Sequence, residues 1–172
     1  MTAARTLKAV FDKLIDVYQS DSALTTWCNT NFGEQPEIQA GIDEDDLSDL
    51  DGKKLAIRII PGARSRTRTM SKRSHGLIIR GIIKNTSKRE PVVPDPDDPP
   101  ADPPVIPETG WLTLEALELV DQFISLIEEA TIPAIQGEGI AITSFEGAPD
   151  QIIYPYARAE LAYLIEIPSK LS

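Results

Sequence analysis

The runs Leu55-Ala-Ile-Arg-Ile-Ile60 and Leu77-Ile-Ile-Arg-Gly-Ile-Ile83 decide the fold of this 172-residue chain. Alternate residues of the first run are apolar, which is the pattern of a strand with one face on a core. The second run is apolar on both faces except at Arg80. We expect the two runs to pair as an antiparallel hairpin, with Pro61 and Gly62 ending the first strand. The predicted hairpin loop, residues 62–75, holds a basic tract formed by Arg64, Arg66, Arg68, Lys72 and Arg73.

Periodicity predicts the remaining elements on either side of this hairpin. Apolar residues recur at three- and four-residue steps over about residues 3–19 and again from Thr113, a candidate N-cap, to about Ala130, so both segments are predicted helices. Pro133 is expected to stop the second helix. Trp27 and Phe32 fall in a stretch predicted to be irregular. Strands are predicted over 139–145, followed by a turn at 147–149, and over 157–167.

The order of these elements is helix, strand, strand, helix, strand, strand. Strands and helices do not alternate one by one along this order, so it predicts an α+β fold rather than a parallel α/β fold. We expect one domain over residues 1–172, with a mainly antiparallel sheet of about four strands and two helices packed on one face. Residues 90–107, rich in proline and aspartate, are expected to form an extended arm between the hairpin and the second helix.

The composition of the chain disfavours several classes of function. The formal net charge is -10, which argues against a protein whose whole surface binds nucleic acid. Cys28 is the single cysteine, so neither an intramolecular disulfide nor a multi-thiolate metal site is available. Charged residues interrupt any signal-peptide core in the first twenty residues, and no apolar run approaches the roughly 18 residues of a membrane span. We expect synthesis in the cytoplasm and no membrane association.

An acidic loop over residues 43–51 precedes the hairpin. Asp43 and Asp45 fit the first and third ligand positions of an EF-hand calcium loop, but Leu47, Ser48 and Lys54 then occupy positions that need a ligand, a glycine and a glutamate. The sequence therefore predicts no metal site in this loop. The candidate binding residues of the loop are its first four carboxylates: Asp43, Glu44, Asp45 and Asp46.

Catalytic motifs are sparse. His75 is the single histidine, and neither a nucleophile elbow nor a glycine-rich phosphate loop occurs. Glu160 and Glu166 share one face of the last predicted strand, but solvated or interfacial glutamates are far commoner there than an acid/base pair. We therefore expect no enzyme activity and no cofactor.

The basic tract is the best local signal of function. Alternate arginines in an extended segment project to one side, where they can meet carboxylates or phosphates. No aromatic residue interleaves with them, which disfavours base stacking. A solvated loop tip and a protein contact are the main alternatives, and contact with DNA is a lesser one. Opposite charges on separate loops would suit head-to-tail packing of identical subunits.

The predicted elements at 7–18, 55–60, 77–83, 114–130 and 157–167, taken in order, resemble the tail terminator proteins of tailed bacteriophages. The resemblance implies a virion protein of the tail or neck that forms a ring, a hexamer in that family, on the end of the tail tube. Such a ring stops tube polymerisation and offers a surface to a head-side connector or stopper protein, while DNA at most passes through its lumen. Strand edges and charged loops would suit a sheet extended across subunits.

Other functions stay open at this point. Another phage neck or tail component, such as a head–tail connector or a tube protein, would also form rings. A small acidic binding protein without enzyme activity would instead act as a monomer.

Overall fold

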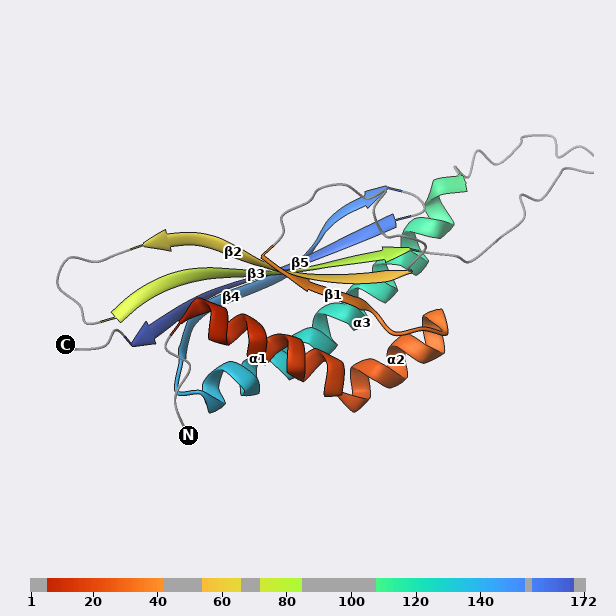
Figure 1. Ribbon diagram of the computed structural model, residues 1–172. Helices are drawn as coiled ribbons and strands as arrows, with labels where there is room; N and C mark the ends of the chain where they lie inside the picture. The colour runs from red at the N-terminus through yellow and green to blue at the C-terminus, as the bar shows by residue number, and fades with distance from the viewer. Residues whose placement is uncertain (1–5, 42–53, 66–71, 85–107, 154–155, 169–172) are drawn as a thin grey trace, which may run out of the picture.

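The computed structural model describes residues 6–41, 54–65, 72–84, 108–153 and 156–168. These residues form three helices and one five-stranded sheet with the strand order β1-β2-β3-β5-β4 (Figure 1). The elements in chain order are α1 (Leu7–Ser20), α2 (Ser22–Phe32), β1 (Glu37–Ala40), β2 (Leu55–Ser65), β3 (Lys72–Lys84), α3 (Glu108–Gly137), β4 (Ala141–Ile153) and β5 (Tyr156–Pro168).

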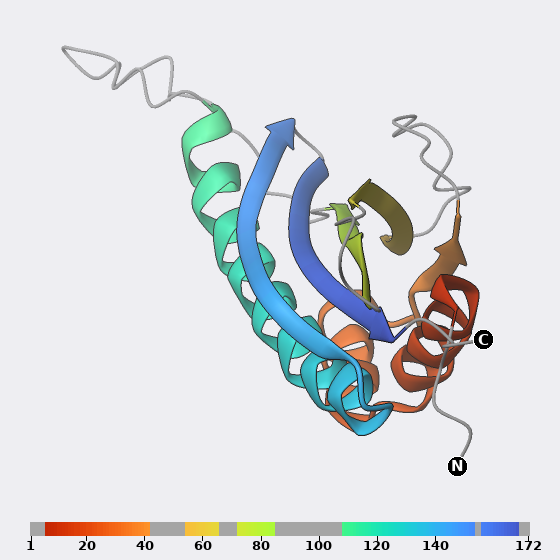
Figure 2. The same cartoon turned by 90° about the vertical axis from the view of Figure 1, so that its left-hand side faces the viewer.

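The three helices lie on one face of a strongly twisted sheet, and α3 runs along β4 and β5 (Figures 1 and 2). All strand pairs are antiparallel except β1 with β2. The predicted α+β class, the mainly antiparallel sheet, the central hairpin and the placement of helices on one face are therefore confirmed. The structure has five strands and three helices where the sequence predicted about four and two.

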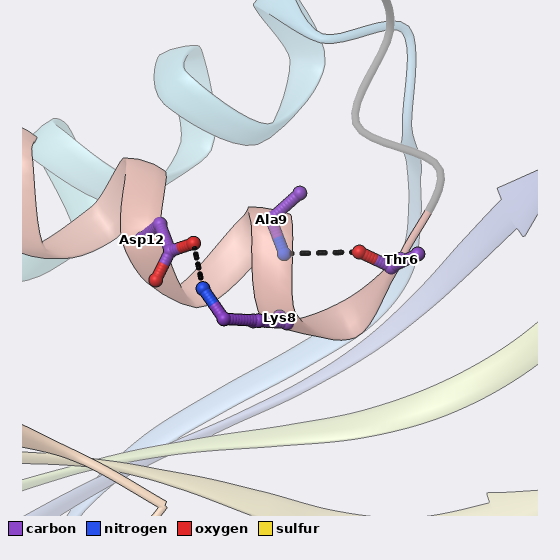
Figure 3. Close-up of polar contacts among 4 residues, drawn as sticks. All are labelled: Thr6, Lys8, Ala9 and Asp12. Carbon is purple, nitrogen blue, oxygen red and sulfur yellow. Dashed lines mark hydrogen bonds and ion pairs between the residues drawn. The ribbon is translucent and has the colours of Figure 1, made fainter.

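Helix α1 follows directly from its sequence. The Thr6 side chain caps the helix, because its Oγ1 accepts a hydrogen bond of 3.2 Å from the Ala9 backbone N–H (Figure 3). Lys8 and Asp12, one turn apart, form an ion pair on the solvent side (Figure 3). The opposite side of the helix is buried through Val10, Phe11, Leu14 and Tyr18.

The core lies between the helices and the sheet. Its sheet side is built from alternate strand residues, among them Ile57, Ile79 and Leu161, each fully buried. Phe123 of α3 packs so closely on β3 that a Cβ at Gly81 would stand 2.3 Å from its Cε1 atom. Only glycine fits at position 81 with the helix at this distance, so this contact sets how closely α3 approaches the sheet.

The stretch around Trp27 and Phe32 is helical, not irregular as predicted. Helix α2 has a low-propensity sequence rich in Thr and Asn, which conceals it. It is stabilised by its N-cap and by tertiary packing instead. Asp21 Oδ1 accepts a hydrogen bond of 2.7 Å from the Leu24 N–H at the N-cap. Leu24, Cys28 and Phe32, spaced four residues apart, are buried.

Both predicted boundaries of the helix in the second half of the chain are wrong. Helix α3 begins at Glu108, so Thr113 lies inside it rather than at its N-cap. The low helix propensity of Thr109 and Gly110 concealed these first turns. The helix also continues through Pro133 to Gly137, because the turns around the proline are anchored by buried Thr131 and Ile135.

The predicted turn at 147–149 lies within β4. Two register shifts against β5, between Ile142 and Ser144 and between Pro149 and Gln151, let the strand continue to Ile153. Pro149 is tolerated because β4 is an outer strand of the sheet, so the missing N–H breaks no ladder on the open side. Gly147 leaves room for Ile124 of α3, whose Cγ2 would stand 2.9 Å from a Cβ at that position.

Two further differences concern the first half of the sheet. Strand β1 was not predicted, because its four residues are too few to show a period. It pairs parallel with β2. Pro61 and Gly62 do not end β2, which continues after a register shift to Ser65, while β3 begins at Lys72. The hairpin loop is therefore shorter than the predicted 62–75. The acidic loop 43–51 and the arm 90–107 lie outside the described residues.

Candidate interaction face of the sheet

The sequence-predicted binding residues fall partly within the strands. Arg64 of β2 is paired with His75 of β3, and Lys72 and Arg73 of β3 are paired with Pro168 and Ile167 of β5. The backbone therefore brings both ends of the basic tract into the sheet. The remaining candidates lie outside the described residues: Arg66, Arg68, Asp43, Glu44, Asp45 and Asp46.

A more defined group of charges lies on the face of the sheet that none of the three described helices covers, which we call the second face. Strand pairing places Gln39, Arg58, Arg80 and Glu160 side by side in one row across β1, β2, β3 and β5. The alternate residues on these strands point into the helix-covered core. The row is therefore set by the register of four strands from distant parts of the sequence.

Arg80 and Glu160 form the better-defined ion pair of this row. Arg80 Nη2 lies 2.9 Å and Nε 3.3 Å from the same Glu160 oxygen, Oε2. The side chains are 12% and 30% exposed, so the pair is partly shielded from solvent. A charge-assisted hydrogen bond in such a setting fixes the orientation of the Arg80 guanidinium.

Arg58 stands directly opposite Arg80 and is less well paired. Its Nη1 lies 3.5 Å from Glu37 Oε1 and has no hydrogen-bond partner, although the side chain is only 8% exposed. The same Glu37 oxygen accepts a hydrogen bond from the Gln39 side-chain amide. Arg58 is thus a buried cation, and its ion-pair partner among the described residues, Glu37, also accepts a hydrogen bond from Gln39.

Apolar residues surround the charged row. Ala56, Ile60 and Ile82 of the second face are buried, and Tyr156 packs against the pair Ala56 and Ile82. Toward β5 the face opens, and Leu164 is 38% exposed. Leu164 thus offers apolar surface on the same face as the charged row, a combination found at protein–protein interfaces.

The buried titratable groups lie on the helix-covered side. Burial raises the pKa of the Cys28 thiol to about 12 and that of the Tyr163 hydroxyl to about 12. Tyr18, whose hydroxyl is 2.6 Å from Thr131 Oγ1, has a pKa well above its ordinary value for the same reason. These groups are protonated at neutral pH, so Cys28 is not an activated thiolate.

Within the described part of the chain, no group of three or more His, Cys, Asp or Glu side chains is placed to hold a metal ion. Among the same residues, no helix combines the length and the apolar character needed to cross a membrane.

Comparison with known proteins supplies no family. A scan against models of known protein families found no match to this sequence, and a search of curated proteins found no relative. The properties of the second face therefore carry the functional argument.

Proposed function

We propose that this chain is a structural protein that assembles with copies of itself into a ring, in the manner of a phage tail terminator. The order of its predicted elements resembles that group, and an α+β subunit with helices on one sheet face is compatible with it. In this role the ring would cap the tail tube, stop its growth and present a joining surface to the head side.

The observation that carries the proposal is the second face. No described helix covers it, and it holds Leu164 at 38% exposure as well as the row of Gln39, Arg58, Arg80 and Glu160. A polypeptide that covered Leu164 would remove its apolar area from water, which is favourable by about 25 cal/mol for each Å² buried. Self-association is the simplest source of such a polypeptide.

Charge separation along the chain supports head-to-tail contacts. The acidic candidates lie at 43–46 and the basic candidates at 64–73, so one copy could present carboxylates to the arginines of the next. A contact between unlike patches closes into a ring when the rotation per subunit divides the circle. The number of subunits, six in the related terminators, is part of the resemblance and not of this argument.

Native mass spectrometry and negative-stain microscopy of the purified chain test the proposal. We expect annular particles, and we expect either charge reversal alone, at the acidic or at the basic candidates, to abolish them. Reversal of both sets in the same chain should restore them. A chain that stays monomeric at high concentration, and also beside purified tail tubes, would contradict the proposal.

The tube experiment also separates the terminator role from other ring-forming neck or tail components. A terminator added to polymerising tube protein should shorten the tubes and occupy their ends. A ring that leaves the tube length unchanged would assign the chain to another position in the virion. A monomer would favour the small acidic binding protein.

A further inference from the structure

The open part of the second face lies over β3 and β5. Strand register forms three neighbouring rows there, each with one residue from either strand: Gly76 beside Leu164, Ile78 beside Ala162, and Arg80 beside Glu160. Leu164 and Ala162 are exposed, and the other four residues are partly exposed. All three rows therefore have surface that a partner can contact.

Each row joins two unlike members. In the first row the large side chain of Leu164 stands next to a glycine, and in the second Ile78 stands next to the methyl group of Ala162. The third row joins a cation to a carboxylate, since Arg80 Nη2 lies 2.9 Å from Glu160 Oε2. In every row the residue on β3 is thus the complement, in size or in charge, of the residue on β5.

This arrangement is self-complementary under two-fold symmetry. Consider a two-fold axis that lies between two facing sheets and runs along their strands, midway between β3 and β5. It places β3 of each copy over β5 of the other. Leu164 then meets the glycine of the second copy, Ile78 meets its alanine, and Arg80 meets its glutamate. Facing positions that combine a large with a small side chain interdigitate, and opposite charges attract.

The twist of the sheet is compatible with this contact. Aligned sheets pack face to face with their strands crossing at about 30°. When the row of Ile78 and Ala162 is at the centre, the other two rows lie two residues away, about 7 Å along the strands. A crossing of about 30° displaces these rows sideways by about 3 Å, a distance that leucine, arginine and glutamate side chains can span.

The charges favour this face over the helix-covered side for contact between copies. A formal net charge of -10 makes identical copies repel one another in general. The side chains that the structure describes on the strands of the second face are balanced, however, with four cations against four carboxylates: Arg58, Arg80, Lys84 and Arg158, and Glu37, Glu146, Glu160 and Glu166. Helix α3, on the opposite side, holds six acidic residues and no basic one. A face-to-face contact therefore joins neutral surfaces and keeps the acidic helices of the two copies apart.

The contact is large enough for a moderately stable pair. Strands β3, β5 and β4 have 13 residues each, which is a length of about 43 Å, and three strands together span about 14 Å. The face that they offer is about 600 Å², or about 1,200 Å² for two copies. Specific interfaces of stable complexes begin near this size.

We propose that the second face joins two copies of this chain in a two-fold contact, with β3 of each copy facing β5 of the other. The inference rests on the self-assembly proposed above and names the surface and the symmetry of one of its contacts. The head-to-tail contact between unlike loops, through residues 43–46 and 64–73, is a separate one, so the two contacts can be tested independently.

Exchange of charges between the strands tests the symmetry of this contact. In Arg80→Glu copies both facing positions of the third row are acidic, and in Glu160→Arg copies both are basic, so each variant should repel itself. In a one-to-one mixture of the two variants, each acidic position faces a basic one. Native mass spectrometry of the full chains, with one variant isotope-labelled, identifies mixed pairs, and circular dichroism checks that each variant is folded.

A second pair of variants probes the first row without changing any charge. Leu164→Ser removes the exposed apolar side chain of this row. Phe145→Ser on β4 is the matched control, because Phe145 is 46% exposed but lies beside Tyr163, whose side chain is buried on the helix-covered side. Sedimentation velocity measures the dissociation constant of the pair in both variants.

We expect pairs in the unaltered chain, monomers in either charge variant alone, and mixed pairs when the two charge variants are combined. Leu164→Ser should raise the dissociation constant by about tenfold or more, since both copies lose an apolar contact. Phe145→Ser should leave the dissociation constant unchanged. If a charge variant fails to fold, the comparison of Leu164→Ser with Phe145→Ser decides alone.

Several results would overturn the two-fold contact: pairs within either folded charge variant, absence of mixed pairs between folded charge variants, or equal dissociation constants in Leu164→Ser and the unaltered chain. Annular particles without any pair that depends on Leu164 would overturn the inference and leave the proposed function standing. Pairs that depend on Leu164, without annular particles, would overturn the proposed function and leave the pair standing. An unaltered chain that stays monomeric up to its limit of solubility would contradict both.

Discussion

Substitution of Gly81 by alanine tests the contact that seats α3 on the sheet. The new Cβ would stand 2.3 Å, 2.5 Å and 2.9 Å from three carbons of the Phe123 ring. Carbon atoms in contact prefer about 3.5–4.0 Å, so the ring or the helix must retreat by about 1 Å. Phe123 is fully buried, and neighbouring core atoms limit that retreat.

The expected loss follows from this geometry. Overpacking of a well-packed core costs about 1–3 kcal/mol, and removal of a glycine from the unfolded chain returns about 0.4–1 kcal/mol. We expect Gly81→Ala to lower the free energy of unfolding by about 1–2 kcal/mol. Urea unfolding followed by circular dichroism measures it; with a slope of about 2 kcal/mol/M, the midpoint should fall by about 0.5–1 M.

Two further variants make the result interpretable. Gly137→Ala at the end of α3 is the control, because a Cβ there meets nothing within 4 Å, and its stability should equal or slightly exceed that of the unaltered chain. Phe123→Leu shortens the opposing side chain. Its combination with Gly81→Ala should be more stable than the sum of the two single effects predicts, by about 1 kcal/mol. Additive effects, or an undiminished midpoint in Gly81→Ala, would refute the proposed packing constraint.

Three other perturbations probe the two faces of the sheet. Glu160→Gln removes the Glu160 charge that lies 2.9 Å from Arg80 and should cost about 1–2 kcal/mol in urea unfolding, whereas an unchanged midpoint would mean that other groups or solvent replace the pair. Tyr18→Phe removes the buried 2.6 Å hydrogen bond with Thr131 and should lower the free energy of unfolding by about 1–2 kcal/mol in the same assay. An unchanged free energy of unfolding would mean that this bond does not stabilise the fold. Burial raises the pKa of Cys28 from 9.0 to about 12, so the unfolded chain loses the thiol proton first and stability should decline from about pH 9 toward 12. Unfolding measured between pH 8 and 10 should show a shallower decline in Cys28→Ala, and an equal slope would contradict this assignment.

The sequence predicts those elements whose burial repeats with a clear period. Strand β5 alternates along its length, with Leu161 and Tyr163 buried and Ala162 and Leu164 exposed, and it was predicted nearly to its ends. Helix α2 was missed because its own residues favour a helix only weakly, and packing of Leu24 and its neighbours stabilises it. The Asp21 cap and the four-residue spacing of its buried side chains were the signals that could have revealed it.

The charged row could not be read from the sequence. Arg58 and Arg80 each interrupt an apolar run, but their direct opposition depends on the register of β2 against β3. That register shifts by one residue between Pro61 and Arg64, a bulge that leaves no recognisable pattern in the sequence. Partners on β1 and β5 add two further registers. Local periodicity thus predicts strands, and only their pairing creates the candidate site.

The outer strands bear on how copies could meet. β4 is long enough to pair with another strand, but Pro149 lacks an N–H, exposed Glu146 adds a charge, and two register shifts distort its ladder. Such features are those by which natural edge strands resist pairing. The other outer strand, β1, offers only four residues. Extension of the sheet along either of these edges is therefore disfavoured, and the self-assembly that we propose would use the second face rather than a strand edge.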